Sequence, residues 1–217
     1  MKKLLVVLCS AVIAMFALAG CGGYTAEDAK DLVEGSLQVD FYGEVTDEFV
    51  DSVVNEKDDL VDDYESSVEE LAAIFAETSG IEAPTDEELN EYRELSKELM
   101  AKAKWEIGEV EEQENGSFIV PVKMYPVDVV DKIVNQFEDD FMPQAEGVDV
   151  NLSDEEYEAQ LMAIAAEIIK GYIKDVDYLD PIELEVEVKE QKSDDDETYF
   201  MVDDSDYEDL CAAFFSF

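Results

Sequence analysis

Residues 182–190, IELEVEVKE, show the most regular pattern in the chain, because apolar and charged side chains alternate without a break. Successive side chains of a strand point to opposite faces of a sheet, so the apolar residues share one face and the charged residues the other. The apolar face consists of Ile182, Leu184, Val186 and Val188. A sheet with one apolar face needs a second layer to cover it, and this requirement constrains the whole fold.

Two segments of the sequence predict β-hairpins. In the first, WEIGEV and SFIVPVKMY flank Asn115-Gly116, a dipeptide that supplies the positive φ angles of a tight connection. Gly108 interrupts the first strand and predicts a bulge. Pro121 has no N–H for a sheet, so its strand is expected at an edge or distorted. In the second hairpin, residues 182–190 return through 198–202, TYFMV.

Helical periodicity fills most of the remaining chain. Capping boxes are expected at Thr85 with Glu88 and at Ser153 with Glu156. The predicted helices cover 25–43, 46–80 with a bend near Asn55, 85–103, 127–141 with a stop at Pro143, a long helix from 153, and 204–215. The long helix is expected to turn inward Tyr157, Leu161, Ile164, Ile168, Tyr172 and Ile173.

This order of elements predicts an α+β fold, with N-terminal helices and a long central helix packed on a four-stranded antiparallel sheet made of two hairpins. Residues 25–217 would form a single acidic domain. EVEEQ at 109–113 and EVKEQ at 187–191 occupy similar places in the two hairpins. Duplicated helix-hairpin units at 85–125 and 153–203 are one reading, and chance similarity is the other.

The first twenty residues have the pattern of a secretory signal peptide. Lys2 and Lys3 precede an apolar run from 4 to 18, and small residues follow it. A membrane-spanning helix is the alternative, but it needs roughly 20 apolar residues. The short apolar core and its flanks favour a signal peptide over residues 1–20.

Leu18-Ala19-Gly20-Cys21 resembles the lipobox of bacterial lipoproteins. The resemblance implies cleavage between Gly20 and Cys21 and attachment of lipid to Cys21, with fatty acids such as palmitate. Residues 21–24 would then be a lipidated cysteine and a short tether, because two or more acyl chains anchor a protein stably. It also implies a place at the cell membrane, facing the extracytoplasmic side. An ordinary cleavage site is the alternative.

The element order also resembles that of small, uncharacterised lipoproteins of Gram-positive bacteria. The resemblance rests on the lipobox, the N-terminal helical half and the hairpins that end in a short helix. Many such proteins carry cystatin-like or ketosteroid-isomerase-like cone domains. That resemblance implies a pocket between sheet and helices, but no particular reaction.

Composition excludes several classes of function. The chain holds 58 Asp and Glu against 14 Lys and Arg, a net charge of −44, which repels nucleic acid. It has no His, so Ser-His and Cys-His nucleophile pairs and the usual zinc sites cannot form. Arg93 is the only arginine, which limits a bidentate grip on phosphate. Neither a catalytic residue nor a cofactor is predicted.

Calcium is the remaining metal to consider, because carboxylates are the oxygen ligands it prefers. The weak candidates are Asp194, Asp195 and Asp196 in a turn, and Asp203 and Asp206 beyond it. Neither group has the spacing of an EF-hand loop. A solvated turn and an acidic helix N-terminus, which the helix dipole favours, are the preferred explanation of these residues.

Aromatic side chains are the last candidates for a site. Trp105, Phe118, Tyr125, Tyr172 and Tyr199 could line a pocket, although core packing is the alternative for each. The sequence thus predicts a membrane-anchored, non-catalytic module that binds a small molecule, a peptide or an envelope protein. A carboxylate-dependent glycan hydrolase and an acidic surface spacer are the alternatives.

Overall fold

The fold of the chain is α+β, as predicted. The computed structural model describes residues 17–19, 24–53, 55–81, 84–192 and 198–216. The helices are α2 (Ala26–Tyr42), α3 (Asp47–Ser52), α4 (Lys57–Glu77), α5 (Asp86–Met100), α6 (Val129–Ala145), α7 (Asp154–Lys174) and α8 (Asp204–Phe214). The strands are β1 (Ala17–Ala19), β2 (Trp105–Ile107), β3 (Glu111–Glu112), β4 (Phe118–Met124), β5 (Ile182–Lys192) and β6 (Thr198–Val202).

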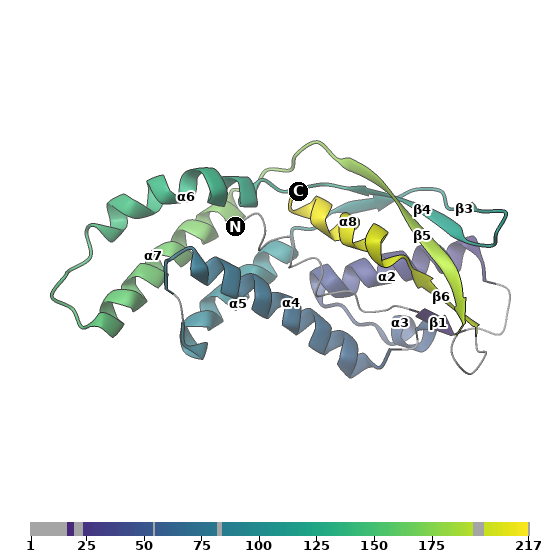
Figure 1. Ribbon diagram of the computed structural model, residues 1–217, viewed down its shortest axis with the longest axis horizontal. Helices are drawn as coiled ribbons and strands as arrows, with labels where there is room; N and C mark the ends of the chain where they lie inside the picture. Colours follow the sequence, from purple (N-terminus) through teal and green to yellow (C-terminus); the bar gives the residue numbers. More distant parts are fainter. Residues whose placement is uncertain (1–16, 20–23, 54, 82–83, 193–197, 217) are drawn as a thin grey trace.

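The two predicted hairpins form one antiparallel sheet. Its strand order is β1-β6-β5-β4-β2, and β3 also pairs with β4 (Figure 1). Strands β4 and β5 join the hairpins, with Phe118 opposite Val188 and Met124 opposite Ile182. The sequence predicted four strands. The structure splits the first of them into β2 and β3 and adds β1 beside β6.

The split between β2 and β3 is the bulge predicted at Gly108. Ile107 lies opposite Val122 and Glu111 lies opposite Ile119, so three residues of one strand face two of the other. Of the two alternatives for the Pro121 strand, the edge position is wrong, because β4 lies between β5 and the β2–β3 strand, and the distortion is present as the bulge beside Pro121. The Pro121 carbonyl accepts a 2.7 Å hydrogen bond from the Gly108 N–H. Its ring nitrogen therefore faces the bulge, where the regular hydrogen bonding is already interrupted.

Helices α2 and α8 cover one face of the sheet. The side chains on that face are buried at Phe118, Val120, Val122, Met124, Val186 and Val188. On the other face Ile119 and Pro121 are half-buried and Glu185 is exposed, as the alternation predicted. The two covering helices also touch each other, since the rings of Phe41 and Phe214 meet edge to face at 5.0 Å.

A second group of helices lies against α2 and extends beyond the sheet. Helices α4 and α5 pack together, and α7 packs on α5 and on α6. In Figure 1, α6 and α7 project on the left, away from the sheet, and we call them the arm. The buried hydroxyl of Tyr92 donates a 2.7 Å hydrogen bond to the Met162 carbonyl, which ties α5 to the arm.

Two predictions about the arm are wrong in detail. Helix α6 continues past Pro143 to Ala145, because a proline in the last turn removes only one helical hydrogen bond. The buried face of α7 consists of Met162, Ala165, Ala166, Ile169 and Ile173. Of the predicted stripe only Ile173 is fully buried, because small alanines allow close helix packing while the larger residues stay half-buried at the rim.

The local signals at the helix ends are confirmed. Capping boxes are present at Thr85 with Glu88 and at Ser153 with Glu156. Gly43 ends α2 with a φ of 64°, in the left-handed region that favours glycine. The helix predicted over 46–80 is interrupted between α3 and α4, around Asn55.

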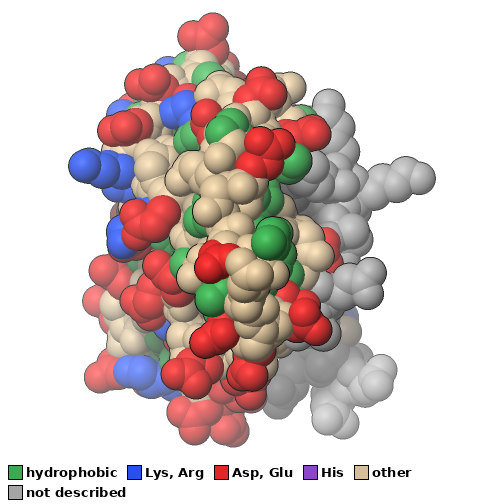
Figure 2. Space-filling view, turned by 90° about the vertical axis from the view of Figure 1, so that its left-hand side faces the viewer, with side chains coloured by type: hydrophobic (Ala, Val, Ile, Leu, Met, Phe, Trp, Pro, Cys, Tyr) green, Lys and Arg blue, Asp and Glu red, His purple; other side chains and the backbone are tan. Residues whose placement is uncertain are grey.

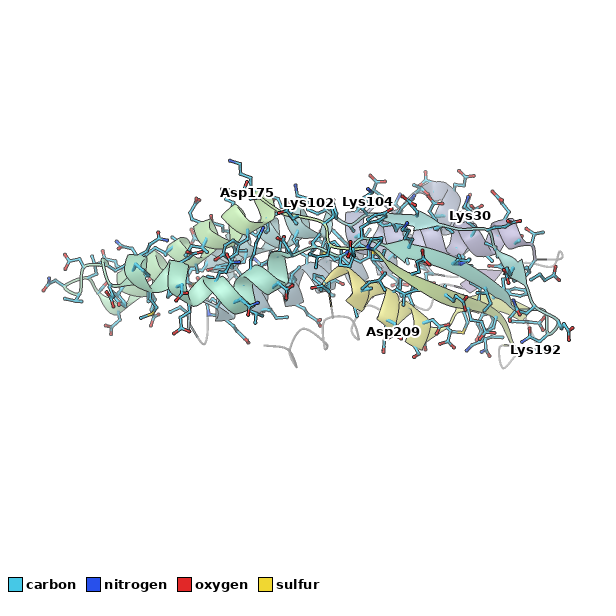
Figure 3. All side chains as sticks on the ribbon, turned by 90° about the horizontal axis from the view of Figure 1, so that it is seen from above. Lys30, Lys102, Lys104, Asp175, Lys192 and Asp209 are labelled. Atoms are coloured by element: carbon cyan, nitrogen blue, oxygen red, sulfur yellow. The ribbon has the colours of Figure 1, made fainter. Side chains whose placement is uncertain are left out.

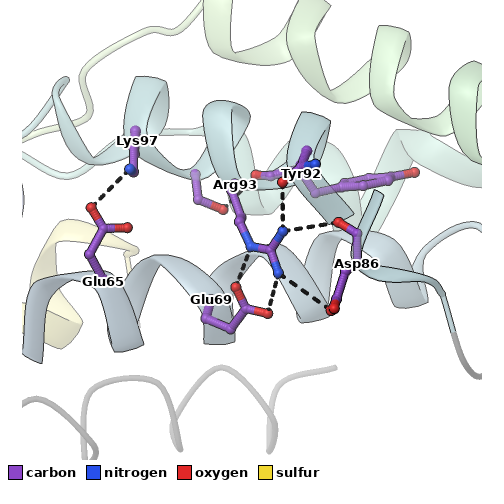
Figure 4. Close-up of polar contacts among 8 residues, drawn as sticks. Glu65, Glu69, Asp86, Tyr92, Arg93 and Lys97 are labelled. Atoms are coloured by element: carbon purple, nitrogen blue, oxygen red, sulfur yellow. Dashed lines mark hydrogen bonds and ion pairs between the residues drawn. The ribbon is translucent and has the colours of Figure 1, made fainter. Parts of the chain in front are cut away.

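The single arginine forms contacts between two helices of this chain. Arg93 of α5 forms a fork on Glu69 of α4, through Nε and through Nη2 at 2.8 Å from Oε1. Its Nη1 donates to the Asp86 carbonyl at 3.0 Å and to Asn90 at 2.8 Å (Figure 4). One turn further along, Lys97 donates to Glu65 at 3.0 Å. These contacts hold α5 against α4 on the solvent side.

Candidate binding site

The five predicted pocket residues do not meet in one cavity. Trp105 lies on β2, and Tyr125 directly follows β4 beside it. Phe118 is buried in the core, in edge contact with Tyr24 and Phe200. Tyr172 of α7 donates a 2.5 Å hydrogen bond to Asp140 of α6. Tyr199 lies on β6, opposite Gln191. Only Trp105 and Tyr125 share a neighbourhood.

That neighbourhood is the segment that leads from α5 into β2. The Tyr42 hydroxyl donates to the Ala103 carbonyl at 2.7 Å, and the Tyr178 hydroxyl donates to the Lys102 carbonyl at 2.8 Å. The Tyr125 N–H donates to the Lys104 carbonyl at 2.9 Å. Three tyrosines from distant parts of the chain therefore meet beside the lysines of this segment. We define the lysine–aromatic patch as Tyr42, Lys102, Lys104, Lys123, Tyr125 and Tyr178.

Two of the three lysines of the patch, Lys104 and Lys123, lie over aromatic rings. The Lys104 ammonium is 4.3 Å from the ring centre of Tyr125 and 5.8 Å from that of Tyr178. The Lys123 ammonium lies 5.8 Å from the ring centre of Tyr125. Such contacts favour a cation over the ring face. The Tyr125 hydroxyl donates to Glu106 at 2.6 Å, and this bond to a carboxylate raises the pKa of Tyr125.

Trp105 packs against Tyr42 of the patch and against the neighbouring Phe41. Its ring stacks on Tyr42 at 5.2 Å and tilts against Phe41 at 6.2 Å. Partial burial raises the pKa of Tyr42, and the nearby Tyr178 and Glu44 raise it further. Tyr42 remains 37% exposed and Tyr178 46%, so both rings still offer surface to a ligand.

The lysines stand out against the charge of the chain. Figure 2 shows acidic side chains over much of the end of the molecule that carries the arm. Among the described residues, Lys57, Lys97, Lys132, Lys170, Lys189 and Arg93 form ion pairs. Within the same part of the chain, Lys102, Lys104 and Lys123 form none, and neither do Lys30, Lys174 and Lys192. Figure 3 shows Lys102 and Lys104 next to each other on one edge of the molecule, with Lys30 further along that edge and Lys192 on the opposite side.

Sequence reasoning found Trp105 and Tyr125 but missed Tyr42 and Tyr178. Tyr42 is the last residue of α2, and Tyr178 lies in the connection from α7 to β5. The one local signal was Tyr178-Leu179, an apolar pair inside an acidic linker. Nothing local to the sequence indicates that both residues meet the segment after α5.

Two hollows lie elsewhere on the molecule. One, about 370 Å³, opens between α2 and α3 and is lined by acidic residues that include Asp28, Asp31 and Glu34. Burial raises the pKa of Asp31, and the neighbouring Glu27 adds to this shift. The other hollow, about 410 Å³, lies between α6 and α7 and is lined by residues that include Lys132 and Tyr172.

The calcium candidates divide into two groups. Asp194, Asp195 and Asp196 lie outside the described residues, as do Gly20 and Cys21. Asp203 caps α8 and pairs with Lys189, which lowers the pKa of its carboxyl group. Asp206 accepts a 2.9 Å hydrogen bond from the Glu187 N–H. Within the described part of the chain, no group of three or more acidic or Cys side chains is arranged to hold a metal ion.

Comparison with known proteins gives one structural neighbour. No family model matches the chain, and no curated protein matches it. A crystal structure of a "putative lipoprotein (ycdA)" from Bacillus subtilis shares the fold, with a TM-score of 0.54 and 19% identity. The match covers 85% of this chain and 54% of the neighbour, so this chain spans about half of its length.

The neighbour is described as a "putative lipoprotein", which names no ligand. In the part of the chain that the structure describes, no helix is both long and apolar enough to cross a membrane.

Proposed function

We propose that the protein is a lipoprotein held at the extracytoplasmic face of the membrane through Cys21, and that its folded domain is a non-catalytic binding module. The observation that carries this proposal is the LAGC motif at 18–21, placed just before a fold that is shared with a protein described as a lipoprotein. The cystatin-like resemblance belongs to the same proposal, as the type of α+β domain that would be carried.

The last residue of the proposed tether, Tyr24, is fixed on the sheet. The Tyr24 ring stacks on Phe200 of β6, with ring centres 3.8 Å apart and planes within 2°. Cys21 lies three positions before Tyr24, and an extended chain spans roughly 3.3–3.6 Å per residue, so the lipidated Cys21 would lie within about 11 Å of Tyr24. Figure 1 shows β6 and the arm at opposite ends of the molecule. The anchor would therefore hold the β6 end near the membrane and leave the arm far from it.

Cleavage before Cys21 would also change the sheet. Strand β1 pairs with β6 through Ala17–Ala19, and these residues belong to the proposed signal peptide. Their removal would leave β6, which spans Thr198–Val202, as the edge strand. A short edge strand limits pairing with other chains, so the mature domain could tolerate it.

The lysine–aromatic patch supports a binding module over a plain acidic spacer. A spacer needs only charge and solubility, whereas this surface fixes three tyrosine rings through their own hydroxyl groups. Rigid rings that remain partly exposed are typical of a binding surface.

Replacement of Cys21 tests the anchor. We expect Cys21→Ser to abolish the incorporation of labelled palmitate and to move the protein out of the membrane fraction, or to block its processing. Cys9→Ser, which lies in the same apolar run, and Cys211→Ser should behave as the parent chain. A Cys21→Ser protein that is processed, labelled and membrane-bound as before would refute the anchor.

A further inference from the structure

We propose that the lysine–aromatic patch binds a saccharide that carries acidic groups, carboxylate or phosphate. This proposal rests on the proposed function, because it names the ligand class of the binding module. The sugar rings would lie against the tyrosines, and the acidic groups would contact the ammonium groups of Lys102 and Lys104.

The arrangement of the tyrosines favours a flat ligand with apolar ring faces. Each hydroxyl of Tyr42, Tyr125 and Tyr178 already donates to a carbonyl or carboxylate of this chain. The rings are therefore held in place and offer their faces rather than a free hydroxyl donor. A surface that is rigid before binding loses little conformational entropy when a ligand stacks on it.

The charge of the patch favours an acidic ligand. Lys102 and Lys104 form no ion pair with any described residue, although acids outnumber bases about four to one in the chain. Lys30, Lys174 and Lys192 also form none, but Lys102 and Lys104 lie in the segment that contacts the tyrosines of the patch. An ammonium group without a carboxylate partner gains most from a ligand that supplies one. A basic ligand would have to approach these lysines against their charge.

The third lysine plays a different part. Lys123 lies between Glu106 on β2 and Glu183 on β5, directly opposite each in the sheet. These two carboxylates offset its charge, and Glu106 also accepts the Tyr125 hydroxyl. We therefore assign the acidic groups of the ligand to Lys102 and Lys104, and we assign to Lys123 a contact with the Tyr125 ring.

Titration calorimetry with the full chain, purified in detergent, tests the proposal. The probes are a hyaluronan hexasaccharide, which alternates uronic acid with N-acetylhexosamine, fully N-acetylated and therefore neutral chitohexaose, and hexaglutamate. We expect the acidic hexasaccharide to bind more tightly than either of the other probes. The Lys102→Gln/Lys104→Gln variant should weaken its binding by about tenfold or more.

Two matched variants control for net charge and for loss of an aromatic ring. Lys30→Gln/Lys192→Gln removes the same charge from lysines that lie away from the patch (Figure 3), and its affinity should stay within about twofold. Tyr178→Ala should weaken binding, whereas Tyr199→Ala on β6 should not. Circular dichroism melting of each variant establishes that it is folded before its affinity is compared.

Several outcomes would overturn the assignment. These are no binding of the acidic hexasaccharide to the folded parent chain, equal binding of hexaglutamate, equal binding of chitohexaose, or equal weakening in the Lys30→Gln/Lys192→Gln control. Such a result leaves the proposed anchor standing if palmitate labelling still depends on Cys21. A chain that is not anchored through Cys21 refutes the proposed function whatever the saccharide result.

Discussion

The hydroxyl of Tyr207 in α8 donates a 2.6 Å hydrogen bond to Oδ2 of Asp40 in α2, and both side chains are buried. This bond joins the first and last helices of the domain on the covered face of the sheet. The other carboxyl oxygen, Oδ1, is buried without a hydrogen-bond partner among the described residues. Burial raises the pKa of Asp40 to about 8, against the opposing effect of the Tyr207 hydrogen bond.

The raised pKa predicts a specific dependence of stability on pH. The folded state holds the Asp40 proton more tightly than the unfolded chain, whose pKa is near the ordinary value of 3.8. This contribution to the free energy of unfolding is complete below about pH 4 and is lost as pH rises through about 8. Asp40→Asn keeps a neutral side chain, so its melting temperature should fall less than that of the parent between about pH 5 and about pH 9.

The same pH series on Asp63→Asn serves as the control. Asp63 is half-buried, its pKa is also raised by burial, and it contributes to the shift at Asp40. Its variant should change the pH profile much less than Asp40→Asn does. Parallel profiles for the parent chain and Asp40→Asn would show that Asp40 does not carry the effect.

Two glycines should respond to alanine in opposite directions. Gly43 has a φ of 64°, and a Cβ there would lie 2.7 Å from the Tyr64 ring. Gly43→Ala should lower the free energy of unfolding by about 1–2 kcal/mol. Gly171 lies inside α7 with nothing within 4 Å of a Cβ, so Gly171→Ala should raise it by up to about 1 kcal/mol. Urea unfolding of both variants measures the pair, and a change of the same sign in both would contradict this account.

The sequence predicted those features whose causes are local. The capping boxes at Thr85 and Ser153 and the turn at Gly43 each depend on residues a few positions apart. The position of Pro121 inside the sheet depends on the pairing of β4 with β5. These two strands are separated in the sequence by the whole of α6 and α7. Pattern alone cannot decide which strand becomes the edge when both hairpins look alike.

The candidate site was less predictable than the fold, for the same reason. Trp105 and Tyr125 belong to one hairpin, so their proximity could be predicted from their strands. Tyr42 and Tyr178 lie 61 and 76 residues along the chain from the residues that accept their hydrogen bonds in the patch. These two tyrosines belong to the patch because of how α2 and the α7–β5 connection pack, and the hydrophobic periodicity of the sequence does not specify that packing.

A second pair of variants tests the bond between α5 and the arm. Tyr92 is 1% exposed, and its hydroxyl donates to the Met162 carbonyl. Tyr92→Phe should cost about 1 kcal/mol, because the bond is lost in a buried setting. Tyr172→Phe also removes one tyrosine hydrogen bond, to Asp140, but at the exposed surface of the arm, and should cost less than about 0.5 kcal/mol. Equal losses in thermal melting would mean that burial of the Tyr92 bond adds nothing.

A comparison of variants at Arg93 and Lys97 distinguishes the contribution of contact geometry from the contribution of charge to the packing of α5 on α4. Arg93→Lys keeps the positive charge but removes the paired contacts with Glu69 and those with Asp86 and Asn90. Lys97→Gln removes a charge but only a single contact, with Glu65. Because these side chains are partly exposed, each variant should lower the melting temperature by only roughly 2–4 °C at most. The loss in Arg93→Lys should persist at about 1 M salt, since it reflects geometry, whereas salt should largely remove the loss in Lys97→Gln. If the effect of Arg93→Lys vanished at high salt as well, Arg93 would hold α5 against α4 by charge alone.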